Sequence, residues 1–198
     1  MTGPAILLLA AGASSRMRGR DKLMEEVAGR PLIAGRVSAA RATGAPVVVT
    51  LPPRARAPAR WQALDGSGAM LVDAAQAAEG MAASLTAGLA ALPAACPGVL
   101  VMLADMPEIT AADLSTLIDA FDGTAILRGA TADGTPGHPV LFPRRDFPAL
   151  AAITGDQGAR GVLKTEADRV RLVPLPGRHA LTDLDTPEDW AAWRADRL

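Results

Sequence analysis

Short apolar runs alternate with helix-like stretches along almost the whole of this sequence. The apolar runs predict strands at residues 5–9, 47–51, 69–72, 99–104, 124–127, 140–142 and 170–174. Helical periodicity predicts helices at residues 31–42, 57–64, 81–92, 111–121, 157–164 and 187–197. Strands and helices in turn, with short connections, indicate a mostly parallel sheet covered on both faces. We therefore expect a single α/β domain over residues 1–198, with helices on both faces of the sheet.

Two segments depart from this rhythm. Residues 134–143 are short and rich in glycine and proline, and they predict an antiparallel strand near 138–143 together with a substrate loop. Residues 52–60 are rich in arginine and proline. Because proline breaks regular structure and arginine prefers water, we expect a surface connection there.

Composition excludes several classes of protein. Apolar residues make up 49% of the chain, which is enough for a core. The apolar runs are too short to span a bilayer, and the N-terminus lacks the basic-then-apolar order of a signal peptide. A single cysteine fits a reducing compartment, so a cytoplasmic location is expected. A net charge of −1, with three tryptophans, three phenylalanines and no tyrosine, argues against nucleic-acid binding.

A loop of small residues follows the first predicted strand. Small residues at 10–15 let backbone N–H groups approach a ligand, and successive N–H groups form an anion-binding concavity. The countercharge that a polyphosphate needs is present in four side chains, Arg16, Arg18, Arg20 and Lys22. The alternative is an ordinary turn with solvated arginines. The glycine spacing matches neither a Walker A motif nor a Gly-x-Gly-x-x-Gly fingerprint, and a Gly-x-Ser-x-Gly elbow is absent.

Carboxylates suggest a metal site beside this loop. Asp105 ends the apolar run 99–104, at the carboxyl edge where such sheets bind ligands. Mg²⁺ takes one or two carboxylates together with phosphate oxygens, which makes Asp105 a candidate ligand. The alternative is a carboxylate that only ends a strand. Asp183 and Asp185 point to the same side of an extended segment, and either is a candidate second ligand.

Other polar residues have structural explanations. Thr110 with Asp113 three residues later predicts a helix cap. Thr186, Pro187 and Asp189 form a second helix start, with the threonine as N-cap and the proline at the first helical position. We expect these five residues to be structural.

A second substrate has two candidate contact regions. His138, flanked by glycine and proline, is one of two histidines, and its alternative is a surface position without a role. Residues 155–160 open a helical stretch. Helix N-terminal amides and Arg160 are candidates for a second phosphate, unless Asp156 is simply a cap.

Six motifs in this order resemble the nucleotidyltransferases of molybdenum cofactor biosynthesis, and within them the cytidylyltransferases. The motifs cover nearly the whole chain and lie at residues 9–17 with 21–22, 80–85, 104–107, 137–139, 155–160 and 183–187. The resemblance implies a single nucleotidyltransferase domain with the three-layer α/β/α, Rossmann-like fold. It also implies transfer of a cytidylyl group from CTP, or another nucleoside triphosphate, to the terminal phosphate of molybdopterin, with release of pyrophosphate.

The resemblance also implies roles for individual residues. Arg16 and Lys22 would neutralise the triphosphate, and Asp105 would hold Mg²⁺ together with Asp185 or Asp183. The nucleotide would contact Leu9, Ala10, Ala11, Gly12, Ala13, Ser14, Gly80 and Ser84. The pterin substrate would contact His138, Asp156 and Arg160.

Some positions affect the choice of nucleotide base, and others depart from the motifs of the family. The guanylyltransferases of this family carry glycine where this chain has Ala11, which favours CTP if the methyl group blocks a purine. The family has glycine at the position of Arg18, so either the turn shifts by one residue or the loop differs. An Asn-Pro pair typical of the family is replaced by alanines at residues 74–75.

Two alternative functions remain open from the sequence. One is a guanylyl- or cytidylyltransferase that acts on another phosphorylated acceptor. The other is a non-catalytic accessory protein that carries the finished cofactor to a molybdoenzyme. A molybdoenzyme or its chaperone is in either case a possible partner.

Overall fold

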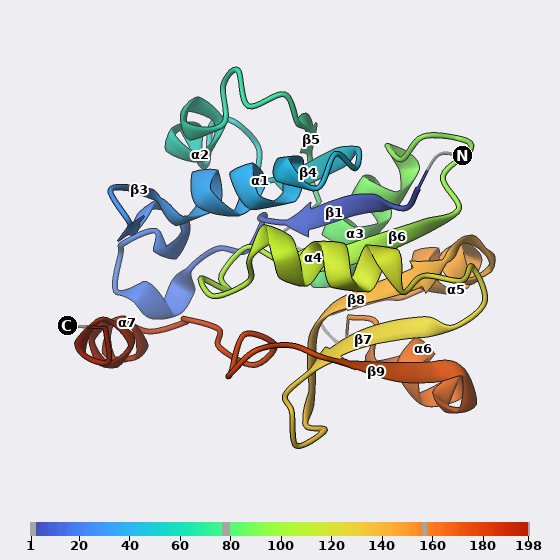
Figure 1. Ribbon diagram of the computed structural model, residues 1–198. Coiled ribbons are helices and arrows are strands. Elements are labelled where there is room, and N and C mark those ends of the chain that lie inside the picture. Colours follow the sequence, from blue (N-terminus) through green and yellow to red (C-terminus); the bar gives the residue numbers. More distant parts are fainter. Residues whose placement is uncertain (1–2, 77–79, 156–157, 198) are drawn as a thin grey trace.

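A seven-stranded sheet forms the centre of the protein (Figure 1). The computed structural model describes residues 3–76, 80–155 and 158–197. Across the sheet the strands are ordered β5 (Met70–Asp73), β4 (Val47–Leu51), β1 (Ala5–Leu9), β6 (Gly98–Leu103), β8 (Pro136–Pro143), β7 (Ile126–Ala130) and β9 (Val170–Pro174). All of these strands follow from the apolar runs, with ends that differ by a few residues.

The sheet is mostly parallel, as expected. Strand β1 pairs in parallel with β4 and β6, and β7 pairs in parallel with β9. Strand β8 is antiparallel to both of its neighbours, β6 and β7. The antiparallel strand expected near 138–143 is therefore confirmed, and it begins two residues earlier, at Pro136.

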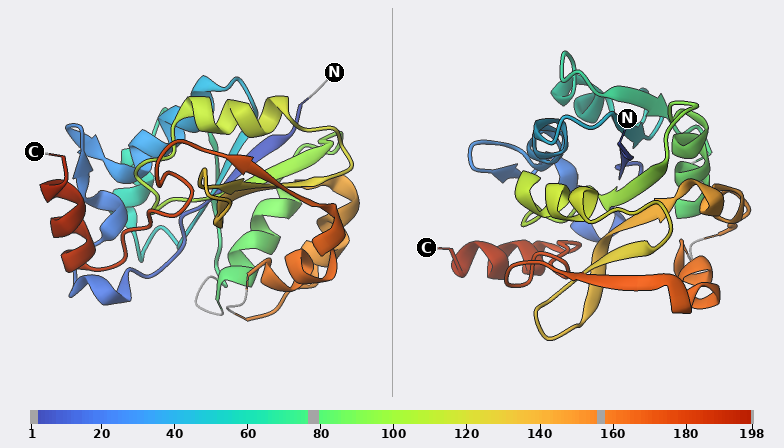
Figure 2. Two further views of the ribbon diagram at one scale, coloured as in Figure 1. Left: turned by 60° about the horizontal axis from the view of Figure 1, so that its bottom comes forward. Right: turned by 45° about the vertical axis from the view of Figure 1, so that its right-hand side comes forward.

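Helices cover both faces of the sheet (Figures 1 and 2). Each face has its own apolar core. Successive side chains of β1 alternate between the cores: Ile6 and Leu8 pack in one and Leu7 in the other. The first core includes residues of α1 (Leu32–Ala42), α2 (Pro58–Ala63), α4 (Ala111–Asp119) and α7 (Pro187–Ala195). The second includes residues of α3 (Met81–Ala90), α5 (Phe147–Ala151) and α6 (Arg160–Thr165). The three-layer α/β/α prediction is confirmed.

Capping residues mark the starts of two helices, and a few short elements were not predicted from the sequence. Both expected caps are capping boxes, with Thr110 and Thr186 each accepting from the backbone N–H three residues later. A small hairpin joins β2 (Glu26–Val27) to β3 (Arg30–Pro31). Strands of two residues and a helix as short as α5 leave too few repeats for a period to emerge. Within the part of the chain described, every helix is too short or too polar to cross a membrane.

The strand order reverses beside β1. The chain passes from β1 through α1 to β4 on one side, whereas β6 lies on the other side. Ligands of open α/β sheets bind at such a reversal, at the carboxyl ends of the strands. The loop after β1 and Asp105 after β6 both lie at this edge.

Gly137 is the tightest glycine near the site. A Cβ atom at this position would lie 1.9 Å from the carbonyl oxygen of Ala180, a backbone atom that cannot rotate away. We expect Gly137→Ala to lower the free energy of unfolding by about 1–3 kcal/mol, measured by urea denaturation. Gly161→Ala is the matched control, because a Cβ there meets nothing within 4 Å. Equal stability of the two variants would contradict the prediction.

Candidate active site

The loop after β1 borders a cavity of about 540 Å³. It turns through left-handed conformations at Ser14 (φ 52°), Arg18 (φ 52°) and Gly19 (φ 86°). Arg18 itself thus adopts a conformation that favours glycine, and its guanidinium pairs with Glu188 at 2.5 Å. The cavity is lined by Ala11, Gly12, Ala13, Ser14, Ser15, Gly19, Arg20, Asp21, Pro52, Pro53, Arg56, Ala57 and Arg60.

Ala10 differs from its neighbours in the loop. Its N–H donates to Thr50 O at 3.0 Å, its carbonyl accepts from Arg60 at 2.6 Å, and its methyl group is buried in the core. Leu9 is likewise paired within the sheet, and its carbonyl accepts from Ala104 N at 3.2 Å. The backbone atoms of Leu9 and Ala10 thus attach the loop to the sheet and to Arg60, and their contact with the nucleotide stays a prediction.

The expectation of a solvated connection at residues 52–60 is wrong for Arg60. This side chain lies in α2 and is only 3% exposed. It forms a two-bond pair with the carboxylate of Asp21, at 2.7 and 2.8 Å. A buried arginine is stable here because carboxylate and carbonyl oxygens replace the water that it loses. Its partner is distant in the sequence, so composition alone gave no signal for it.

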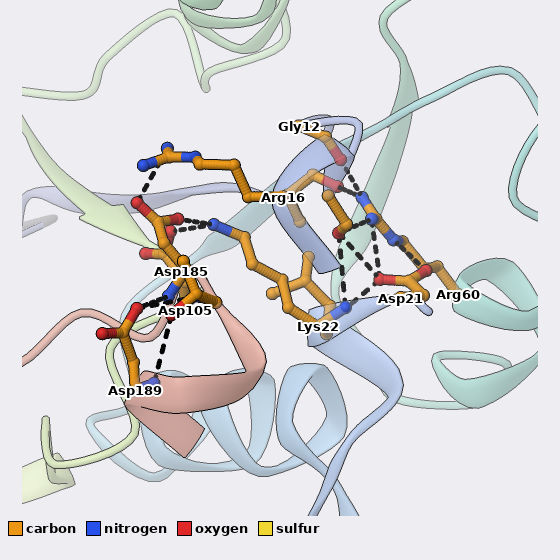
Figure 3. Close-up of polar contacts among 12 residues, drawn as sticks. Gly12, Arg16, Asp21, Lys22, Arg60, Asp105, Asp185 and Asp189 are labelled. Carbon is orange, nitrogen blue, oxygen red and sulfur yellow. Dashed lines mark hydrogen bonds and ion pairs between the residues drawn. The ribbon is translucent and has the colours of Figure 1, made fainter. Parts of the chain in front are cut away.

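Lys22 connects two carboxylates at the carboxyl edge of the sheet (Figure 3). Its Nζ lies 2.5 Å from Asp105 Oδ2 and 2.6 Å from Asp185 Oδ1. The second oxygen of Asp185 pairs with Arg16 Nη2 at 2.8 Å. The structure thus brings four of the predicted site residues together in one cluster of ion pairs. Arg16 and Lys22 are its cations, and Asp105 and Asp185 are its anions.

Backbone contacts hold the two carboxylates side by side. Leu184 N donates to Asp105 O at 3.1 Å, which fixes the segment before α7 against the end of β6. The carboxylate of Asp189 then accepts from the backbone N–H of Asp185 at 3.2 Å as well as from that of Thr186 at 2.8 Å. The cap of α7 therefore also positions Asp185.

Burial and charge oppose each other at this cluster. Burial lowers the pKa of Lys22, but the adjacent carboxylates of Asp105 and Asp185 outweigh it, and the net pKa is raised. The lysine therefore stays charged throughout the neutral range. Burial raises the pKa of Asp183, and the charges of Asp105 and Asp185 raise it further. Of the two aspartates, Asp185 is the one whose carboxylate contacts Lys22 and Arg16, which makes it the stronger candidate for a cation.

The cluster offers hard oxygen donors of the kind that Mg²⁺ binds. Asp105 Oδ1 is buried and has no hydrogen-bond partner within the residues described, so it is available to a cation. No group of three or more His, Cys, Asp or Glu side chains suited to a metal occurs in segments 3–76, 80–155 and 158–197. The arrangement fits an ion held by two carboxylates and completed by substrate phosphates, not an all-protein cage.

A second charged region lies on β7 and β8. His138 lies on β8, and its buried Nδ1 has no partner among the described atoms. Arg128 on β7 donates from Nε to Gly137 O at 2.9 Å, and its charge acts on His138. The charges of Arg160, the first residue of α6, and of Asp105 also act on His138. Arg128 was not predicted to be a site residue, although an arginine directly after the predicted strand at 124–127 was a signal for it.

The pKa of His138 gives a prediction for stability. Burial, with a smaller contribution from Arg128, lowers this pKa from 6.5 to about 4. Below pH 6.5 the unfolded chain therefore binds a proton that the folded protein does not bind until about pH 4. We expect stability to fall as the pH drops through this window, by about 1–3 kcal/mol from this group.

Urea unfolding of the wild type and of His138→Gln at several values between pH 4 and pH 7.5 tests this. The difference between the two free energies of unfolding should change across the window and be constant above pH 7. A difference that is the same at every pH would show that His138 already titrates normally in the folded protein.

The remaining predicted residues lie around the start of α3. Gly80 (φ 116°) precedes this helix, and Ser84 is 5% exposed within it. The N–H of Ala82 donates to Gly155 O at 3.3 Å, which places the segment before α6 against the same helix end. Neither Gly80 nor Ser84 is among the residues that line the 540 Å³ cavity. Asp156 lies outside the described residues.

Solved structures share this fold over nearly the whole chain. Rv0371c of Mycobacterium tuberculosis H37Rv is 32% identical, with a TM-score of 0.82 over 97% of this chain and 98% of that one. Its manganese complex aligns at 29% identity, with a TM-score of 0.77 over 96% and 97% of the two chains. A nucleotidyl transferase of Methanothermobacter thermautotroptrophicus, Mth528, is 21% identical, with a TM-score of 0.84 over 99% and 98%. At that identity the last likeness concerns the fold alone.

Sequence comparisons identify the family. The purine catabolism protein PucB of Bacillus subtilis is 28% identical over 94 residues, 47% of this chain and 45% of that protein. The match thus spans less than half the length of this curated relative. The family model of the MobA-like NTP transferase domain matches residues 6–170, which include the loop after β1, Lys22 and Asp105. The chain therefore belongs to the family of MobA-like NTP transferase domains.

Proposed function

We propose that the protein transfers a cytidylyl group from CTP to the terminal phosphate of molybdopterin and releases pyrophosphate. The observation that carries the proposal is the position of Lys22 between Asp105 and Asp185, next to the loop of small residues after β1. A nucleoside triphosphate needs this combination, because the reaction depends on positioning and charge stabilisation.

Different residues would bind the nucleotide, offset its charge and hold the metal ion. Amides of the loop at residues 11–14 bind the triphosphate, and Arg16 and Lys22 offset its charge. An oxygen of the acceptor phosphate attacks the α-phosphorus in line, the bond from that phosphorus to the bridging oxygen breaks, and pyrophosphate leaves with the electron pair. No covalent enzyme intermediate is needed. Asp105 and Asp185 would hold Mg²⁺, which supplies further neutralisation of phosphate charge when bound.

The acceptor would bind on the β7–β8 side of Asp105. His138, which is neutral near pH 7, offers its unpartnered Nδ1 to the pterin. Arg160 and Arg128 supply positive charge on the same side, in keeping with a phosphorylated acceptor. Asp156 remains part of this proposal. Gly80 and Ser84 would lie near the base and ribose.

Base selection is assigned to Ala11. This residue lines the 540 Å³ cavity and is 7% exposed, so its methyl group occupies space at the base of the loop. Isothermal titration of CTP, GTP and ATP in the presence of Mg²⁺ tests the assignment. We expect CTP to bind most tightly in the wild type and GTP binding to improve in Ala11→Gly. Tighter binding of GTP than of CTP by the wild type would overturn the cytidylyl assignment.

The acceptor is tested separately. Pyrophosphate release from CTP should depend on molybdopterin and should not occur with sugar or isoprenoid phosphates. Pyrophosphate release with one of those acceptors would instead support a nucleotidyltransferase that acts on another phosphorylated substrate. Tight binding of the finished cofactor without any turnover would instead support an accessory protein that delivers it to a molybdoenzyme.

A further inference from the structure

Every N–H group of the Arg60 guanidinium has an acceptor. The Nε atom and one Nη2 bond go to the two oxygens of Asp21. The other Nη2 bond goes to Ser14 Oγ at 3.1 Å. Nη1 donates to Ala10 O at 2.6 Å and to Gly12 O at 2.9 Å. These five bonds use the full donor capacity of an arginine, which no other side chain offers in this planar arrangement.

The two carbonyl contacts determine where the loop amides point. In a trans peptide the C=O and the N–H point in opposite directions. Because the carbonyls of Ala10 and Gly12 face Arg60, the N–H groups of Ala11 and Ala13 face away from it. Neither N–H donates to an acceptor in the part of the chain that the structure covers. Two free amides are therefore presented together from a loop whose opposite side is fixed.

The Asp21 contact extends the effect to Lys22. The Asp21 carboxylate accepts from Leu23 N at 3.0 Å and so caps the short helix η2 (Lys22–Met24). Ser14 Oγ, which receives a bond from Arg60, also accepts from Lys22 N at 3.3 Å. Arg60 thus holds both the loop amides and the turn that carries Lys22, although it lies 39 residues beyond Asp21 (Figure 3).

We propose that Arg60 is the positioning residue of the nucleotide site, which aligns the Ala11 and Ala13 amides for the triphosphate and fixes the turn of Lys22. The proposal deepens the function proposed above and depends on it for the identity of the ligand. Arg60 does not touch the reacting atoms. Its effect passes through the backbone of the loop and through Asp21.

Arg60→Lys is the principal variant, because it keeps the charge but has one donor atom in place of three. We expect its KM for CTP and its Kd for inorganic tripolyphosphate to rise about tenfold, since the loop amides lose their alignment. We expect kcat to fall less than KM rises, because the Lys22 side chain keeps its own carboxylate partners. Asp21→Asn should reproduce the loss in part.

Hydrogen exchange gives a readout that needs no ligand. In Arg60→Lys, the hydrogen-bonded amides of the loop and its turn, at Met17 and residues 22–24, should exchange faster than in the wild type, and exchange in the strands should be unchanged. Arg54→Lys is the matched control, because Arg54 lies on the same connection, is exposed and does not line the cavity. It should match the wild type in every measurement.

Chemical rescue separates a positioning role from a general effect on folding. Arg60 borders the 540 Å³ cavity, so free guanidinium can reach the space left in Arg60→Ala. Millimolar guanidinium should restore tripolyphosphate binding and activity to this variant but not to Lys22→Ala. If Arg60→Ala does not fold, the binding and exchange data of Arg60→Lys decide the question.

The outcomes distinguish this inference from the proposed function. Unchanged Kd for tripolyphosphate and unchanged loop exchange in Arg60→Lys would overturn the role of Arg60. A wild type that binds tripolyphosphate in an Arg60-dependent manner but releases no pyrophosphate from any nucleoside triphosphate would overturn the proposed function and leave the positioning role intact. A wild type that binds no polyphosphate would overturn both.

Discussion

Asp105→Asn is expected to slow pyrophosphate release by about 10²–10³-fold, the largest effect of any single change considered. Asp105 supplies one oxygen to Lys22 at 2.5 Å and has a second, buried oxygen without a partner in the segments described. Asparagine has nearly the same shape but carries no charge, and one of its two terminal atoms is a donor. The variant therefore loses the cation ligand and the partner of Lys22 in one step.

The measurement is steady-state pyrophosphate release at saturating CTP, over a range of Mg²⁺ and Mn²⁺ concentrations. Asp119→Asn is the control, since Asp119 is an exposed carboxylate at the end of α4. Thermal unfolding of both variants shows whether the fold is retained. Turnover of folded Asp105→Asn within about threefold of the wild type would remove Asp105 from the reaction.

Lys22→Met should separate metal binding from turnover. The ammonium group of Lys22 holds one oxygen of Asp105 and one of Asp185, so its loss leaves two negative charges near each other with less compensation. A divalent cation relieves that repulsion, and we expect Mn²⁺ to bind on the order of tenfold more tightly. Turnover should nevertheless fall about 10²-fold, because the charge that stabilises the departing phosphate is gone.

Mn²⁺ titration by calorimetry and pyrophosphate release measured on the same samples test this separation. Lys164→Met is a closely matched control, because Lys164 is the only other lysine and is exposed on α6. Lys22→Arg keeps the charge and should recover part of the turnover. Weaker Mn²⁺ binding in Lys22→Met would mean that the carboxylates are not the metal site.

Local patterns were sufficient to predict most of the fold. The apolar run of β1 predicts the strand with both ends correct, and the same holds for β4 and β9. The caps at Thr110 and Thr186 follow from side chains within one helical turn. The position of Asp105 at the carboxyl edge of the sheet was also predictable, because this residue ends the apolar run that forms the buried strand β6.

Contacts between distant segments could not be predicted in the same way. Arg60 was expected in water because arginine usually is, and only the fold brings Asp21 and the loop carbonyls to it. Lys22 was predicted to contact phosphate, and the bonds of its ammonium group to Asp105 and Asp185 had no signal in the local sequence. Its choice of partner depends on which segments meet at the sheet edge, a property of topology and not of local sequence.

The cluster around Lys22 also has a consequence for the order in which the protein acquires activity. Lys22 pairs with one residue 83 positions away and with another 163 positions away. Contacts of such sequence separation form late, because long loops must close first. During synthesis the loop and β6 are complete well before Asp185 and its helix are made. The nascent chain therefore completes the loop after β1 before it completes the charge cluster. If the proposed function holds, we expect activity to begin only when the segment that carries Asp185 docks against β6.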